Sequence, residues 1–135
     1  MLIQTPEADW LGWHAARQPD KAALHVVGRE SVSYAALDDR ASRLACWLRG
    51  LGLQEGDTIG LLLDNDARTV ELWWAARRAG LYFVPLGTRL KPTEIVYILR
   101  DSGARALVAA PAFADLAAST RRRGRNAGPM APPTG

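Results

Sequence analysis

The 135-residue chain contains one cysteine, Cys46, and two histidines. A single cysteine excludes an internal disulfide and any metal site built from several cysteines. No run of eighteen apolar residues occurs, so we expect no membrane-spanning helix. The first residues also lack a basic segment followed by an apolar one, which is the pattern of a secretory signal peptide. These absences favour a cytoplasmic protein.

Positive charge is concentrated near the end of the chain. Of the 17 Lys and Arg residues, four are Arg121, Arg122, Arg123 and Arg125, and the other 13 are balanced by 14 acidic residues. A basic surface for nucleic acid is therefore not expected in the rest of the chain, and we predict no nucleic-acid partner. The four arginines lack interleaved aromatic residues, so we favour a solvated segment over a contact with RNA or anionic lipid.

Hydrophobic spacing predicts alternating strands and helices. Helices are expected at residues 7–17, 34–51, 66–79, 92–102 and 111–118, and strands at 22–27, 30–33, 58–63, 81–86 and 104–109. From Thr58 onward strand and helix alternate with short connections, which is typical of parallel βαβ units. The predicted fold class is α/β, with the folded part at residues 1–118. Residues 119–135 are rich in Arg, Gly and Pro and are expected to form a disordered tail.

Six short segments occur in a characteristic order between Pro19 and Ala110. They are PDKAAL at 19–24, SYAAL at 33–37, LGLQEGD at 51–57 with Asn65 following, residues 75–86 ending in VPL, LKPTEIVYIL at 90–99, and DSGA at 101–104. Together they resemble the amino-terminal part of the adenylate-forming superfamily, the AMP-binding acyl-CoA synthetases. Residues 74–82 are most similar to bacterial fatty-acyl-CoA synthetases. Gly87 departs from the family, which commonly has asparagine there.

The resemblance implies the first βαβ units of a large amino-terminal domain, incomplete in this chain. Full-length members use ATP, Mg²⁺ and CoA to convert a carboxylic acid, here expected to be a fatty acid, into its CoA thioester through an acyl-adenylate. The family's phosphate-binding loop and its carboxy-terminal domain with the catalytic lysine are not found in these 135 residues. We therefore expect this chain to be inactive alone and to use no cofactor of its own.

Three explanations for such a chain stay open: a truncated or frame-shifted gene, one half of a split synthetase, or a non-catalytic module that binds a partner. Strands that normally pair with later elements would leave a sheet edge exposed. Self-association through that edge is therefore expected.

The loop Gly87-Thr88-Arg89 is the candidate binding site. It follows an expected parallel strand, at the edge where such sheets bind ligands. In related acetyl-CoA synthetases the matching loop lies near the CoA nucleotide, which implies that Arg89 meets a phosphate. A simple turn with an exposed arginine is the alternative that we favour.

Other chemically capable residues are expected to have structural roles. Asp64 and Asp66 flank Asn65 without the spacing of a calcium loop, so we interpret them as loop and helix-cap residues rather than metal ligands. Asp57 is expected to stabilise a turn, His14 to lie on a helix face and His25 on a strand surface. Cys46 is expected to be a packed apolar residue. The tryptophans Trp47, Trp73 and Trp74 are expected to pack against helices rather than to bind an acyl group.

Overall fold

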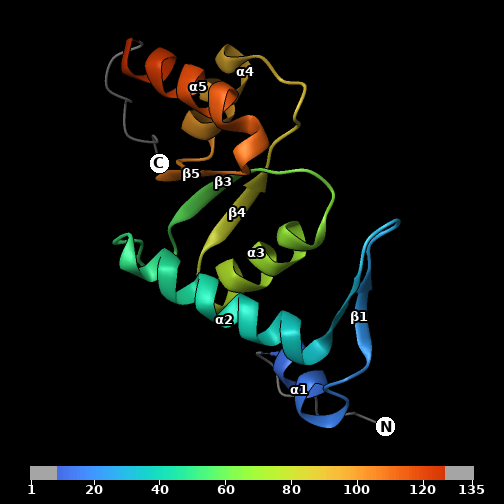
Figure 1. The fold of residues 1–135 in the computed structure, drawn as a ribbon. Helices are drawn as coiled ribbons and strands as arrows, with labels where there is room; N and C mark the ends of the chain where they lie inside the picture. Colours follow the sequence, from blue (N-terminus) through green and yellow to red (C-terminus); the bar gives the residue numbers. More distant parts are fainter. Residues whose placement is uncertain (1–8, 127–135) are drawn as a thin grey trace, which may run out of the picture. The chain divides into compact units, whose positions relative to one another are not determined.

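The computed structural model describes residues 9–126, which form two compact units (Figure 1). The first unit contains described residues 9–52 together with 66–80, and the second contains 53–65 together with 81–126. Each unit is therefore assembled from two separate stretches of the chain.

The first unit consists of three helices and a β-hairpin. The helices are α1 (Trp10–Arg17), α2 (Tyr34–Gly50) and α3 (Ala67–Arg78), and β1 (Ala22–His25) pairs antiparallel with β2 (Ser31–Ser33). The hairpin expected around Gly28 is confirmed, and this glycine has a positive φ of 75°. The first helix was expected from Glu7, which lies outside the described residues.

Capping side chains set the starts of two helices as predicted. The hydroxyl of Ser33 accepts a hydrogen bond from the Ala36 N–H at 3.1 Å, at the start of α2. The carboxylate of Asp66 accepts one from the Arg68 N–H at 2.9 Å, at the start of α3. Each bond satisfies a donor that the helix itself cannot pair.

The core of the first unit is formed where its helices meet the hairpin. Leu11, Val32, Leu37 and Ala41 are buried, and Trp74 packs against them. Helices α2 and α3 pack against each other and bury several alanines, including Ala41 and Ala75, which are both 0% exposed. Small residues at these positions let the two helix backbones approach closely.

The second unit is built on a three-stranded parallel sheet. Strands β3 (Thr58–Leu62), β4 (Tyr82–Pro85) and β5 (Ala106–Ala109) lie in the order β4-β3-β5. Helix α4 (Pro92–Asp101), the short helix η1 (Pro111–Phe113) and α5 (Ala114–Asn126) complete the unit. The predicted α/β class with parallel strands is confirmed.

Helix α4 approaches the central strand closely because one strand residue is glycine. Leu62, Leu86 and Ile95 form the buried core of this unit, and Leu99 of α4 packs against them. A Cβ atom built on Gly60 would lie 2.5 Å from Leu99 Cδ2, closer than carbon atoms can approach. Gly60 therefore makes room for the helix side chain at the centre of the sheet.

The predicted boundary at Ser119 is wrong for the described part of the tail. Helix α5 continues to Asn126, whereas residues 127–135 of the expected tail lie outside the described residues. Arginine is a good helix former, and Leu116 packs in the core of the second unit, which anchors the helix. Arg100 of α4 also donates a hydrogen bond to the Gly124 carbonyl at 3.0 Å.

Two packing predictions on α2 are also wrong. Cys46 is exposed rather than packed, and Trp47 is 48% exposed. The buried face of α2 follows the spacing Leu37, Ala41, Ala45 and Leu48, which leaves both residues on the other side of the helix. Trp74 fulfils its predicted packing role, while Trp73 is 41% exposed. Within the described residues, no helix is long and apolar enough to cross a membrane.

Arg78, at the end of α3, links all three helices of the first unit. Its guanidinium donates to both carboxylate oxygens of Asp9 at 3.1 and 2.8 Å and to the Asp38 carboxylate. It also donates to the Asp38 carbonyl at 3.0 Å and to the Ser42 hydroxyl at 2.8 Å. Asp9 in turn caps α1 by accepting from the Gly12 N–H at 3.1 Å. One side chain thus joins the start of α1 to the middle of α2.

The environment of Arg78 favours its charged form. Burial of the guanidinium opposes the charge, but the hydrogen bonds and negative charges of Asp38 and Asp9 outweigh it, so the pKa of Arg78 is raised above its usual range. Arg78 therefore remains positively charged across the whole neutral pH range.

We expect Arg78→Lys to lower the free energy of unfolding by about 1–2 kcal/mol and Arg78→Ala by about 2–3 kcal/mol. A lysine ammonium cannot reach two carboxylates and a carbonyl in the geometry of a guanidinium. Arg43→Ala is the control, because Arg43 forms an exposed ion pair with Asp39 within α2 and should change stability by no more than about 0.5 kcal/mol. Urea unfolding followed by circular dichroism measures the three variants, and equal effects of Arg78→Ala and Arg43→Ala would contradict the linking role.

Adding side-chain volume at Gly60 should destabilise the second unit. Gly60→Ala is expected to lower the free energy of unfolding by about 1 kcal/mol and Gly60→Val by about 2–3 kcal/mol, because Leu99 must move. At Gly50, the last residue of α2, a Cβ meets nothing within 4 Å, so Gly50→Ala should stabilise by up to about 1 kcal/mol. In thermal unfolding, we expect the melting temperature to fall for Gly60→Ala and to rise for Gly50→Ala.

Candidate functional site

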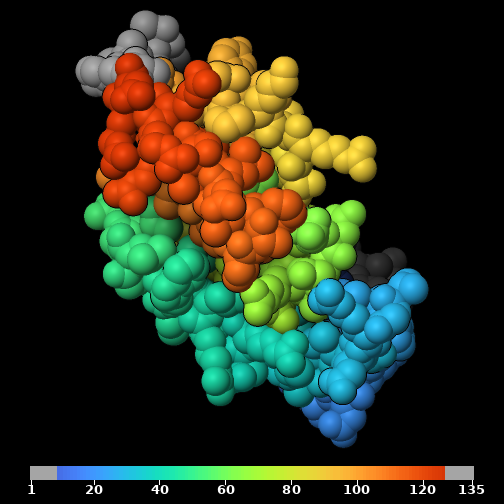
Figure 2. Space-filling model, turned by 45° about the horizontal axis from the view of Figure 1, so that its top comes forward, coloured from blue at the N-terminus to red at the C-terminus, as the bar shows by residue number. Residues whose placement is uncertain are grey.

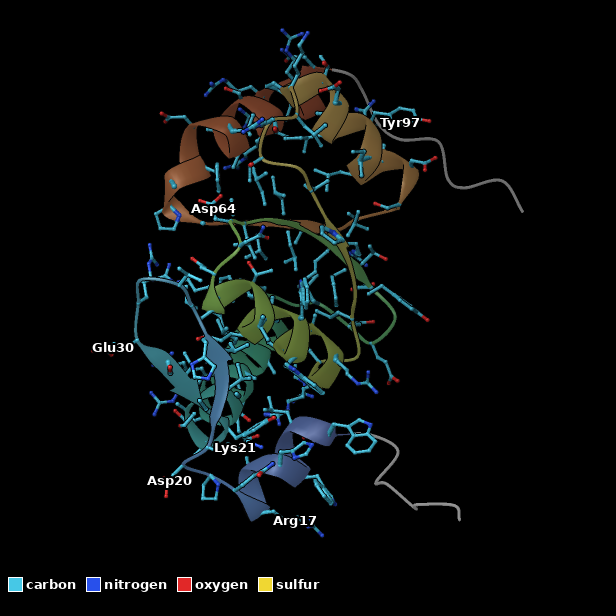
Figure 3. The ribbon with its side chains drawn as sticks, turned by 90° about the vertical axis from the view of Figure 1, so that its right-hand side faces the viewer. Arg17, Asp20, Lys21, Glu30, Asp64 and Tyr97 are labelled. Atoms are coloured by element: carbon cyan, nitrogen blue, oxygen red, sulfur yellow. The ribbon has the colours of Figure 1, made fainter. Side chains whose placement is uncertain are left out.

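Three loops meet at the carboxyl edge of the parallel sheet in the second unit. Residues 63–65 follow β3, residues 86–91 follow β4, and Ala110 follows β5. Figure 3 shows Asp64 in the loop directly after β3. Because the strands are parallel, all three loops lie at the edge where open α/β sheets bind ligands.

The predicted binding loop forms a turn at this edge. The Leu90 N–H donates a hydrogen bond to the Gly87 carbonyl at 3.2 Å, which closes the turn around Thr88 and Arg89. Thr88 is half-buried and Arg89 is exposed. The loop is fixed to the sheet just before it, where the Leu86 N–H donates to the Leu61 carbonyl at 2.8 Å. The favoured interpretation, a turn with an exposed arginine, describes this geometry.

The start of α4 holds the other side of the loop in place. A Glu94 carboxylate oxygen accepts a hydrogen bond from the Lys91 N–H at 2.7 Å, and Pro92 occupies the first helical position. This carboxylate already occupies the Lys91 backbone donor. An anion bound at the loop would therefore use the guanidinium of Arg89 and the hydroxyl of Thr88 as its donors.

Asp66, in the acidic segment after β3, caps a helix as predicted. Its carboxylate caps α3, and Asp64 and Asn65 are exposed in the preceding loop. Over residues 9–126, no three His, Cys, Asp or Glu side chains gather as they would around a metal ion.

Of the remaining candidate side chains, His14 and His25 belong to the first unit and Asp57 to the second. His14 stacks on Tyr34 with ring centroids 5.1 Å apart, while His25 lies on the exposed surface of β1 and is 2.8 Å from the Ser31 hydroxyl. The Asp57 carboxylate accepts from the Gln54 N–H at 2.8 Å, so its predicted role in the turn before β3 is confirmed. His25 thus has a serine hydroxyl as its hydrogen-bond partner, whereas His14 has the Gln18 side-chain amide at 2.9 Å.

Sequence reasoning missed the ordered arginines of α5. They were assigned to a disordered tail, but the structure places them on a helix beside α4 (Figure 2). The available signal was Leu116 and Thr120, which are one helical turn apart and precede Gly124 at the same spacing. The high content of Arg and Gly outweighed that short pattern.

Comparison with known proteins identifies the family. The profile of the family described as "AMP-binding enzyme" matches residues 11–129. The chain belongs to the AMP-binding enzyme family. This result confirms the resemblance recognised from the six sequence segments.

Similar AMP-binding enzymes include several CoA ligases. A feruloyl-CoA synthase from Amycolatopsis is 38% identical over 104 residues, which is 77% of this chain and 21% of that protein. The long-chain-fatty-acid–CoA ligase FadD13 of Mycobacterium tuberculosis is 35% identical over 77 residues, covering 57% of this chain and 15% of the relative. The chain thus spans about a fifth or less of the length of these relatives.

Solved structures of the family share this fold. The O-succinylbenzoate CoA synthetase MenE of Bacillus subtilis, solved with AMP, matches with a TM-score of 0.78 at 28% identity, covering 86% of this chain and 30% of that one. The N-terminal domain of FACL13 from M. tuberculosis matches with a TM-score of 0.76 at 29% identity, covering 82% of this chain and 28% of that one.

Proposed function

We propose that this chain provides the first part of the scaffold of an AMP-forming acid–CoA ligase. The family match over residues 11–129 is the observation that supports the proposal, together with relatives named as acyl- and aryl-CoA ligases. In such a reaction a carboxylate attacks the α-phosphate of ATP and releases pyrophosphate, and the CoA thiol then displaces AMP from the acyl-adenylate. ATP, Mg²⁺, CoA and a carboxylic acid are therefore the proposed reactants of a complete ligase.

In this proposal the described residues hold and orient the reactants and do not themselves react. The parallel sheet fixes three loops at one edge, and the bond between Lys91 and Glu94 keeps the Gly87–Leu90 turn in place. Arg89 and Thr88 would hold a phosphate group of CoA at this edge. This proposal assigns no described side chain to adenylate formation itself.

We expect the isolated 135-residue chain to form no acyl-adenylate and no acyl-CoA. Adenylation needs fixed donors and a metal around the ATP phosphates. The purified chain is incubated with ATP, Mg²⁺, CoA and either a fatty acid or ferulic acid, and pyrophosphate release and thioester formation are measured. Turnover above a chain-free control would contradict the scaffold role and require a catalytic site within these residues.

A chimeric enzyme separates a scaffold from an unrelated binding module. Residues 11–110 replace the matching segment of FadD13, and the chimera is assayed for fatty-acyl-CoA formation. A scaffold should retain measurable activity, whereas the alternative, a non-catalytic module that binds a partner, predicts an inactive chimera and association of the free chain with a separate synthetase. The control is FadD13 with its own segment cut out, which should be inactive.

In an active chimera, Arg89→Ala should raise the KM for CoA by about threefold to tenfold and leave kcat within about twofold. Loss of one exposed charge-assisted contact to a phosphate has that size. Arg68→Ala is the matched control, because Arg68 is also an exposed arginine next to a helix start. An unchanged KM for CoA in Arg89→Ala would eliminate the loop as a CoA contact.

The finer expectations from the sequence remain predictions. Relatives of similar identity are named for ferulate and for long-chain fatty acids, so the fatty-acid preference is tested by the two-substrate assay above. Self-association through the outer strands β4 and β5 and a cytoplasmic location also stay predictions.

A further inference from the structure

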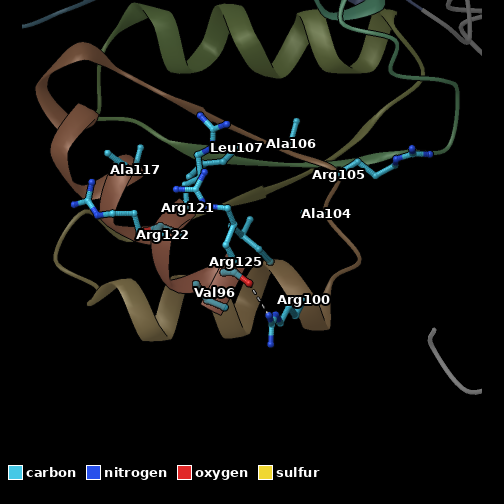
Figure 4. A pocket seen from close by; sticks show the side chains of 14 residues that line it. Val96, Arg100, Ala104, Arg105, Ala106, Leu107, Ala117, Arg121, Arg122 and Arg125 are labelled. Carbon is cyan, nitrogen blue, oxygen red and sulfur yellow. Dashed lines mark hydrogen bonds between the residues drawn. The ribbon is translucent and has the colours of Figure 1, made fainter. Parts of the chain in front are cut away.

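The second unit contains an arginine-lined pocket that the proposed ligase role does not use. It has a volume of about 890 Å³ and is bounded by α4, the start of β5 and α5 (Figure 4). Ala104 and Arg105 place it beside the amino end of β5, whereas the Gly87–Leu90 turn lies at the carboxyl edge of the same parallel sheet. The pocket and the proposed CoA-binding loop are therefore at opposite ends of the strands.

The lining of this pocket combines five arginines with an apolar wall. The arginines are Arg100, Arg105, Arg121, Arg122 and Arg125, and Val96, Leu99 and Leu107 supply apolar surface. Among the residues that the structure describes, no acidic residue lines the pocket. A volume of this size matches that of sites for small organic ligands, which usually combine apolar walls with a few polar groups.

Two of these arginines lack neutralising partners. Arg121 and Arg125 are one turn apart on α5, and within residues 9–126 neither forms an ion pair or a side-chain hydrogen bond. Like charges at this spacing repel each other. An anion between the two guanidinium groups would remove that repulsion and accept several charge-assisted hydrogen bonds.

The other arginines are at least partly engaged. Arg100 donates to the Gly124 carbonyl at 3.0 Å and so holds the last turn of α5 against α4. Arg105 extends away from the α5 arginines in Figure 4 and lies 3.8 Å from the Asp57 carboxylate. Arg122 donates to the Ser119 hydroxyl at 3.1 Å. Arg100 is thus a positioning residue, and Arg121 and Arg125 are the ones available to a ligand.

Small residues leave space for a ligand beside these arginines. Ala117 precedes Arg121 by one helical turn, and Ala118 and Gly124 also line the pocket. Ala106 and Leu107 of β5 form the wall of the pocket on the sheet side. A ligand with a charged end and an apolar body would place its charge between Arg121 and Arg125 and its body on this wall.

We propose that the pocket between α4, β5 and α5 binds a phosphate monoester with an apolar group, and that Arg121 and Arg125 hold the phosphate. A guanidinium donates two parallel N–H groups, which match two oxygens of one phosphate. A phosphate dianion also neutralises both side chains at once, whereas a carboxylate neutralises only one. The same chemistry occurs in a soluble ester and in a lipid headgroup, and the experiments below distinguish these two sources.

Hexyl phosphate, hexanol and inorganic phosphate are the probes, titrated into the purified 135-residue protein by calorimetry at low salt. We expect saturable binding of hexyl phosphate with a dissociation constant below about 1 mM, at least about fivefold weaker binding of inorganic phosphate, and none of hexanol. Equal affinity for the two phosphates would overturn the apolar part of the site. Absence of saturable hexyl phosphate binding would overturn the whole proposal.

The double variant Arg121→Gln/Arg125→Gln should weaken hexyl phosphate binding at least about tenfold. Its charge-matched control is Arg29→Gln/Arg123→Gln, two exposed arginines outside this pocket, which should stay within about twofold of the parent. Glutamine keeps helix propensity, and circular dichroism checks the fold. Equal losses in the two double variants would show a nonspecific charge effect and contradict the site.

The variant Arg121→Lys/Arg125→Lys keeps both charges and gives a second measurement if the glutamine variant unfolds. It should bind hexyl phosphate more weakly than the parent, because lysine cannot donate in a bidentate manner. Vesicles containing phosphatidic acid test the lipid source. Binding to vesicles without binding of hexyl phosphate would indicate a surface charge effect and refute the pocket.

Discussion

The guanidinium of Arg78 is the contact on which the first unit depends most. It hydrogen-bonds Asp9, which caps α1, and both the side chain and the backbone of Asp38 in α2. The end of α3 is tied a second time, because Arg49 donates to the Arg78 carbonyl at 2.6 Å. Apolar burial alone does not set the angles between short helices, whereas directional bonds from one planar group do. This fixed helix arrangement also holds Trp74 and Leu37 in the core that supports the hairpin.

In the second unit, the close packing of Leu99 against Gly60 sets the position of α4 on the sheet. Gly60 lets Leu99 approach the central strand, and Leu86 packs in the same core immediately before the Gly87–Leu90 turn. The position of the proposed CoA loop is thus set by buried side chains below it and by the Lys91–Glu94 bond beside it. The arginine-lined pocket lies at the other end of the strands and depends on the contact between Arg100 and α5. The hydrogen-bond donors of the CoA loop and of the arginine-lined pocket are therefore both held in place by the packing of α4 against the sheet.

Much of this architecture could be predicted from the sequence because its signals are local. Ser33 and Asp66 cap helices, Gly60 and its neighbours form a continuous apolar strand, and residues 58–109 alternate strand with helix. Nonlocal interactions were not predictable in the same way. Arg78 is 69 residues from Asp9, and no short pattern links them. Cys46 and Trp47 were assigned to packing because they are apolar, but the turn of α2 places them outward. The order of α5 depends on contacts with α4 that its own composition does not reveal.

The interleaving of the two units also determines the order in which the chain can fold on the ribosome. The first unit is complete once residue 80 has been made, and β3 has by then been synthesised without either neighbour. Its partner β4 follows within a few residues, whereas β5 ends only at Ala109. At about 5–20 residues per second, β3 therefore waits for roughly one to five seconds with one edge open after β4 has been made. The apolar side chains of Ile59, Leu61 and Leu62 are exposed to other nascent chains during that interval, so translation speed should influence the yield of folded protein.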